Sequence, residues 1–206
     1  MMQSNDDIDS PSKDHRATRY SLLARALDGS NERAWEELYE QYQSYIYYLL
    51  RKFSTQESDL DDLAQDVMVT LMKNLKTYDK DKGKFRTWFS VMVRNIYFAH
   101  IRKLSRKDAV LQQYKEQPID SYSPDELTGI IKEEWEQFIL DSAYRRIEDT
   151  FRGKAIDVFK LTLQGMPLKE IASRLDLSES SVYNLKYRVR KSLITEISDI
   201  QASLEI

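Results

Sequence analysis

The stretch PLKEIASRLDLSESSVYNLKYRVRKSL, residues 167–193, carries the clearest structural signal in this chain. Its first part places apolar side chains three and four residues apart, at Leu168, Ile171, Ala172 and Leu175. Its second part repeats this spacing at Val182, Leu185, Val189 and Leu193. Two amphipathic helices separated by a short break are typical of a helix-turn-helix. The stretch therefore predicts that motif.

The residues around the break support the same interpretation. Pro167 is expected at the first position of the first helix, where its missing N–H costs nothing. Asp176, Leu177 and Ser178 are expected to form the turn, with Ser178 capping the second helix. Such turns usually carry glycine where this chain has Asp176. Because Asp enters the left-handed region at modest cost, we expect the turn to form nevertheless.

The second helix is predicted to expose a polar and basic face, because residues 183–191 contain four cations and no acid. The residues expected on this face are Ser180, Ser181, Tyr183, Asn184, Tyr187, Arg188 and Lys191. A recognition helix reads base edges in the major groove, where Asn favours adenine and Arg favours guanine. We therefore expect DNA binding, with Asn184 and Arg188 reading bases. The alternative is a solvated basic face on a purely structural helix hairpin.

The composition of the whole chain favours a helical protein, since its 206 residues include only 5 Gly and 4 Pro. The absence of cysteine excludes disulfides and thiolate metal sites, and with only two histidines we expect no metal and no cofactor. No apolar run approaches the roughly 18 residues of a membrane span. Residues 1–14 lack the apolar core of a secretory signal. A cytoplasmic protein without membrane insertion is expected.

The net charge of −3 hides a strong segregation of charge along the chain. Residues 84–107 carry seven cations and no acid, whereas residues 120–149 carry nine acids and three cations. A polyanion responds to local charge rather than to the total. This acidic chain is therefore compatible with nucleic-acid binding through its basic segments.

Apolar periodicity predicts further helices over about residues 35–53, 60–75 and 85–107, and again from about residue 130. Residues 1–15 are expected to be a disordered acidic tail. Residues 108–130 lose the periodicity and contain Pro118 and Pro124, so they are the expected linker. The predicted fold is all-α, with two small helical domains joined by a flexible linker and the helix-turn-helix in the C-terminal one.

Several motifs of the N-terminal half follow one another in a set order. They are DLAQDVM at 62–68, a lysine-rich loop after Tyr78, FRTWF at 85–89, VRN at 93–95 and IRK at 101–103. Together with a helix-turn-helix that follows an acidic linker, they resemble the extracytoplasmic-function (ECF) sigma factors of bacterial RNA polymerase. The resemblance covers about residues 20–106 and 131–196.

The resemblance implies roles for the matching residues. Asp62, Gln65 and Asp66 match the stretch that docks on the clamp helices of the largest polymerase subunit. The residues that match minus-ten recognition are Tyr78, Lys82, Lys84, Arg94, Asn95, Arg102 and Lys103. In this set the loop from Tyr78 captures a flipped base, Asn95 with Arg94 forms the adjacent part of the pocket, and the basic run holds the DNA backbone. The recognition helix would read the minus-thirty-five element.

The implied organisation is a region-two domain over residues 16–107, a linker over 108–130 and a region-four domain over 131–206. The implied function is promoter recognition and DNA melting as a polymerase subunit, without catalysis of its own. Core polymerase and promoter DNA are the implied partners, and an anti-sigma factor is a further candidate. The chain departs from the family at Ala99, where Asp is usual, and at Tyr183 and Leu185, which are often basic.

Two other functions remain open on the sequence alone. A stand-alone helix-turn-helix regulator would use residues 20–107 to sense a ligand or to dimerise, and would bind duplex DNA without polymerase. A nucleic-acid-processing enzyme would need clustered carboxylates for a metal, and the candidates are Asp59, Asp61, Asp62 and Asp66. These acids lie largely at a helix start, where the helix dipole already accounts for them.

Overall fold

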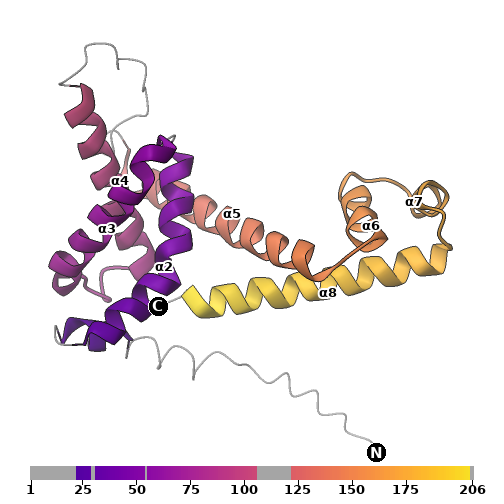
Figure 1. Cartoon of the computed structure of the whole chain (residues 1–206), viewed down its shortest axis with the longest axis horizontal. Helices are drawn as coiled ribbons and strands as arrows, with labels where there is room; N and C mark the ends of the chain where they lie inside the picture. Colours follow the sequence, from indigo (N-terminus) through magenta and orange to yellow (C-terminus); the bar gives the residue numbers. More distant parts are fainter. Residues whose placement is uncertain (1–21, 29–30, 54, 106–121, 205–206) are drawn as a thin grey trace, which may run out of the picture. The chain divides into compact units, whose positions relative to one another are not determined.

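The computed structural model describes residues 22–28, 31–53, 55–105 and 122–204, and every regular element in these ranges is a helix (Figure 1). The α-helices after the short helical segment 22–27 are α2 (Glu32–Lys52), α3 (Leu60–Asn74), α4 (Phe85–Ser105), α5 (Pro124–Thr150), α6 (Lys154–Leu163), α7 (Leu168–Leu175) and α8 (Glu179–Leu204). Two short 3-10 helices, η1 (Glu57–Asp59) and η2 (Leu75–Thr77), flank α3. None of the described helices is both long and apolar enough to cross a bilayer.

The chain divides into two compact units, which we call the N-terminal unit (residues 1–134 and 204–206) and the C-terminal unit (residues 135–203). The all-α prediction and the prediction of two small helical domains are confirmed. The expected acidic tail, residues 1–15, lies outside the described residues, as do residues 108–121 of the expected linker.

The last part of the expected linker is helical, because α5 begins at Pro124. The hydroxyl of Ser123 accepts a hydrogen bond from the backbone N–H of Glu126 at 3.3 Å, and the Glu126 carboxylate accepts one from the Ser123 N–H at 2.8 Å. This reciprocal pair is a capping box, and Pro124 occupies the first helical position, where proline is favoured. The Ser123 contacts also hold the pKa of Glu126 below its usual value. Pro124 therefore starts a helix rather than marking a loop.

Three helices, α2, α3 and α4, build the core of the N-terminal unit. Each contributes apolar side chains at helical spacing, and many of them are fully buried, among them Leu38, Tyr42, Ile46, Leu63, Val67, Phe85 and Phe89. Tyr42 meets Phe85 and Phe89 edge-on at centroid distances of 5.4 and 5.2 Å. Such edge-to-face pairs add to the burial of the rings. Tyr42 of α2 therefore serves core packing.

The C-terminal unit contains the predicted helix-turn-helix in α7 and α8. Ile171, Ala172 and Val182 are buried in one cluster with Val158 and Leu161 of α6, and the partly buried Leu168, Leu175, Leu177 and Leu185 pack against it. Val189 is buried in a second cluster, with Leu193 against it. The predicted inward stripes are therefore confirmed. Pro167 precedes the first helical residue, Leu168, so the prediction that Pro167 is the first residue of the helix placed the helix start one residue too early.

The turn has the expected conformation. Asp176 lies in the left-handed region at φ 50° and ψ 61°, and its backbone carbonyl accepts a hydrogen bond from the Lys154 ammonium at 3.3 Å. The Ser178 hydroxyl accepts a hydrogen bond from the Ser181 N–H at 3.1 Å, which confirms Ser178 as the cap of α8. The positive φ explains why this position usually holds glycine.

The left-handed conformation predicts an order of stability at position 176. We expect Asp176→Gly to be as stable as the natural protein or more stable by up to about 1 kcal/mol, because glycine carries no Cβ strain there. Asp176→Val should be less stable than Asp176→Gly by about 1–2 kcal/mol, because a β-branched residue fits this region poorly. Urea unfolding followed by circular dichroism measures both. Equal stability of the two variants would contradict the role assigned to the turn.

Candidate nucleic-acid and partner surfaces

The predicted base-reading residues lie on the outside of α8. Tyr183, Asn184, Tyr187, Arg188 and Lys191 are all exposed, whereas Val182 and Val189 of the same helix are buried. Ser180 is exposed, and Ser181 is half-buried because it takes part in the cap at Ser178. Leu185, the position often basic in the family, is partly buried against both clusters of the unit. The face is thus polar and basic without a contribution from Leu185.

The predicted polymerase-docking residues form an exposed face on α3. Asp62, Gln65 and Asp66 are exposed, while Leu63, Ala64 and Val67 between them are buried. Two neighbouring acids are engaged within the unit. Asp61 accepts a 2.6 Å hydrogen bond from the Tyr47 hydroxyl, which raises the pKa of that phenol to about 12. Asp59 lies 3.3 Å from the His100 imidazole.

A hollow of about 390 Å³ lies between the end of α3 and the middle of α4. Its lining is mostly apolar, and the residues are Thr70, Asn74, Thr77, Trp88, Val91, Met92, Asn95, Ile96 and Ala99. Asn95 is exposed and presents an amide to this hollow, where it can both donate and accept hydrogen bonds. An apolar hollow with a few amide and hydroxyl groups suits a flat heterocycle. The family's usual Asp is replaced here by Ala99.

The loop that begins at Tyr78 closes on itself next to this hollow. The Tyr78 hydroxyl donates a hydrogen bond to the Gly83 carbonyl at 3.1 Å. The Tyr78 ring lies 5.6 Å from that of Trp88, a residue of the hollow, and edge-on to Phe85 at 5.3 Å. The structure therefore brings Tyr78 and Asn95 to the same side of the unit, connected through Trp88. The loop residues Lys82 and Lys84 are exposed.

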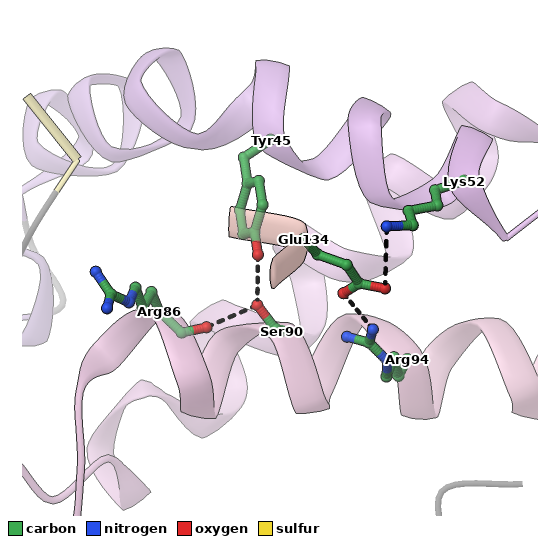
Figure 2. A network of polar contacts seen from close by, with 6 residues as sticks. All are labelled: Tyr45, Lys52, Arg86, Ser90, Arg94 and Glu134. Atoms are coloured by element: carbon green, nitrogen blue, oxygen red, sulfur yellow. Dashed lines mark hydrogen bonds and ion pairs between the residues drawn. The ribbon is translucent and has the colours of Figure 1, made fainter. Parts of the chain in front are cut away.

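Arg94 does not lie with Asn95, although the two were predicted to act together. Its side chain is buried and forms an ion pair with Glu134 of α5 (Figure 2). The Arg94 guanidinium also lies 4.9 Å from the centroid of the Phe53 ring. Consecutive residues of a helix point in directions about 100° apart, so an exposed Asn95 leaves Arg94 on the core side. In this arrangement the Arg94 guanidinium is not available to DNA. The structure therefore does not bring Arg94 to the hollow with Asn95, and Arg94 is left out of the minus-ten surface proposed below.

Glu134 is the residue that sequence reasoning missed. It is only 5% exposed, and its carboxylate also lies 3.8 Å from the Lys52 ammonium of α2. Figure 2 shows the carboxylate between the cations of α2 and α4. The Tyr45 hydroxyl and the Ser90 hydroxyl lie 2.8 Å apart close by, and burial raises the pKa of Tyr45. Glu134 thus ties the first part of α5 to the N-terminal unit.

The other predicted backbone-binding cations lie at the end of α4. Arg102 and Lys103 are exposed, as a role in phosphate contact requires. The remaining basic residues of that run, Arg106 and Lys107, lie outside the described residues. The basic end of α4 and the exposed lysines of the Tyr78 loop belong to the same unit.

Comparison with protein families gives two matches. Residues 38–107 match sigma-70 region 2, and residues 157–193 match sigma-70 region 4. The first match contains α3, α4 and the Tyr78 loop, and the second contains the helix-turn-helix. The first segment thus contains the acidic face of α3, the Tyr78 loop and the hollow, and the second contains the exposed basic face of α8.

Individual known proteins are also similar to this chain. The chain is 22% identical over 162 residues to the ECF RNA polymerase sigma factor SigE of Mycolicibacterium smegmatis, covering 78% of this chain and 60% of that protein. It is 26% identical over 192 residues to the RNA polymerase sigma-E factor of Clostridium acetobutylicum, covering 85% and 81%. A solved structure of CnrH in complex with the cytosolic domain of CnrY is 22% identical, covering 87% of this chain and 96% of that chain, with a TM-score of 0.34.

Proposed function

This chain belongs to the ECF sigma factors of bacterial RNA polymerase, and on that premise we propose that it binds core polymerase and directs promoter recognition and DNA melting. Core polymerase and promoter DNA would be its partners, in the cytoplasm. An anti-sigma factor is a further candidate partner on family grounds alone. The protein would carry out no covalent chemistry itself, because its work is to bind two DNA elements and to hold one of them open.

The observation that carries the proposal is that one unit contains both the exposed acidic face of α3 and the mostly apolar hollow between α3 and α4. Asp62, Gln65 and Asp66 on α3 offer carboxylates and an amide to a basic protein surface. The hollow between the end of α3 and the middle of α4 offers Asn95 and the Trp88 ring to an unstacked base. A protein that melts DNA while attached to an enzyme needs both surfaces.

The proposed melting step uses binding energy rather than catalysis. Extruding a base from the duplex costs a few kcal/mol, which stacking and edge hydrogen bonds in a pocket offset. In this chain the Asn95 amide would bind the base edge, and Trp88 and Tyr78 would supply aromatic surface. Lys82, Lys84, Arg102 and Lys103 would hold the backbone of the opened strands. The helix-turn-helix would fix the upstream end of the promoter.

The exposed face of α8 yields a test of base reading. Arg188→Ala should weaken promoter binding by the holoenzyme by about 1–3 kcal/mol and relax the preference at a single upstream base pair. Asn184→Ala should do the same at a different base pair. Binding to promoter fragments randomised over the minus-thirty-five element measures both. A uniform loss across all sequences would contradict base reading and assign these side chains to the backbone.

A stand-alone regulator is the second candidate, because the helix-turn-helix is complete in itself. The two functions differ in their dependence on polymerase. We expect the tagged protein to bind a promoter fragment tightly only when core polymerase is present. Immunoprecipitation of the tagged protein should then recover the fragment. Electrophoretic mobility shifts with and without core polymerase measure this. Nanomolar specific binding by the protein alone would favour the stand-alone regulator and contradict the proposal.

A further inference from the structure

A second hollow, of about 330 Å³, lies in the N-terminal unit between the Tyr78 loop, the start of α4 and the first turns of α5. Its polar lining residues are Lys82, Lys84, Arg86, Thr87, Thr128 and Lys132. Thr128 and Lys132 come from the segment that the sequence places in or next to the linker. The hollow therefore combines predicted DNA-binding lysines with residues to which no role has been assigned.

The chemistry of this hollow is that of an anion site. Four of its lining residues are cations and two carry hydroxyls, and no carboxylate is among them. Lys82 contacts Asp79 at 3.4 Å, but its side chain remains 84% exposed, so this pair is weak. Cations and hydroxyls in this combination bind the phosphates of nucleic acids.

The fold fixes the position of the α5 residues in this hollow. Thr128, Ile131 and Lys132 share one face of the helix, since they are three and four residues apart. Ile131 is buried, and three residues further on Glu134 pairs with Arg94 and Lys52. These contacts hold the face against the unit, and the exposed Lys132 side chain remains at the surface beside the basic lining of α4.

We propose that this hollow binds a backbone phosphate of promoter DNA beside the minus-ten element, with Lys132 as a further contact residue. The proposal rests on the proposed function and extends its DNA-binding surface from the Tyr78 loop onto α5. The first turns of α5 then act as part of the DNA-binding unit rather than as a spacer between domains. A phosphate contact positions the strand and carries no base preference.

The test is binding of a fluorescent pre-melted promoter fragment by holoenzyme reconstituted with core polymerase, over a series of salt concentrations. We expect Lys132→Gln to bind roughly threefold to tenfold more weakly, equally for all minus-ten sequences. The salt dependence should become shallower by about 0.7–0.9 in log–log slope, because one phosphate contact is lost. Lys132→Arg keeps the charge and should bind like the natural protein.

Arg25→Gln is the matched control, because it removes the same charge from the same unit at a residue that pairs with Glu37. It should leave the affinity and the slope unchanged. An unchanged affinity and slope in Lys132→Gln would overturn the inference while the proposed function stands. Stabilisation of the protein by added pyrophosphate is measured as well. If Lys132→Gln abolishes that stabilisation but leaves promoter binding unchanged, the hollow binds a free phosphate compound and the inference is also overturned. Absence of polymerase-dependent binding by the natural protein would overturn both proposals.

Discussion

Replacing Asp62, Gln65 and Asp66 together by alanine should reduce co-purification with core polymerase by at least about a hundredfold, with the fold retained. Truncating charged contacts at a protein interface costs about 2–5 kcal/mol for each well-packed pair, and three neighbouring losses exceed what most interfaces tolerate. The fold should survive because these side chains are exposed and their neighbours Leu63, Ala64 and Val67 carry the packing. Circular dichroism measures the fold, and pull-down with tagged core polymerase measures binding.

The control for this variant removes acids from another helix of the same unit. Glu36 and Glu40 of α2 are exposed, so Glu36→Gln with Glu40→Gln lowers the negative charge to the same extent without touching α3. This double variant should bind polymerase normally. If the triple variant also binds at the natural level, the acidic face of α3 is not the docking surface.

Glu134→Ala is expected to destabilise the N-terminal unit by about 3–5 kcal/mol. The substitution leaves the buried Arg94 guanidinium without its carboxylate partner, and an uncompensated charge in a core is far more costly than a missing surface ion pair. Such a loss is a large part of the total stability of a small unit. Urea unfolding followed by circular dichroism at 222 nm measures it, with the C-terminal unit as an internal reference.

A double substitution separates the loss of the pair from the loss of side-chain volume. Arg94→Met with Glu134→Leu replaces both charges by apolar groups, and such replacements are often neutral or stabilising. We expect it to restore most of the stability that Glu134→Ala loses. If the free energy of unfolding of Glu134→Ala lies within about 1 kcal/mol of that of the natural protein, Glu134 does not hold α5 to the unit. The same result would weaken the placement of Lys132 in the phosphate hollow.

The helix-turn-helix could be predicted from sequence because its determinants are local. The stripes of α7 and α8, the Ser178 cap and the left-handed Asp176 all depend on residues within a few positions of one another. The start of α5 is also encoded locally, by Ser123, Pro124 and Glu126. Pro124 was instead interpreted as a sign of the linker. The physical distinction lies in the Glu three residues after Ser123, which completes a capping box.

The Arg94–Glu134 pair could not be predicted in the same way. The two residues are 40 positions apart, and a charge in a basic segment is normally exposed. Helical spacing places Arg94 on the face of Tyr97, three residues further on and buried, and this was the available signal. Asn95 shows the converse case, because its predicted place in a base pocket agrees with its position in the hollow beside Trp88. Its function there stays a prediction.

Run-off transcription tests the central claim most directly. Core polymerase is incubated with a library of genomic promoter fragments, with and without this protein, and the transcripts are sequenced. We predict transcripts that depend on the protein, that start downstream of a shared pair of minus-thirty-five and minus-ten elements, and that disappear with the Asp62/Gln65/Asp66 variant. The absence of any protein-dependent transcript, with folded protein and active polymerase, would contradict the assignment of this chain as a promoter-specificity subunit.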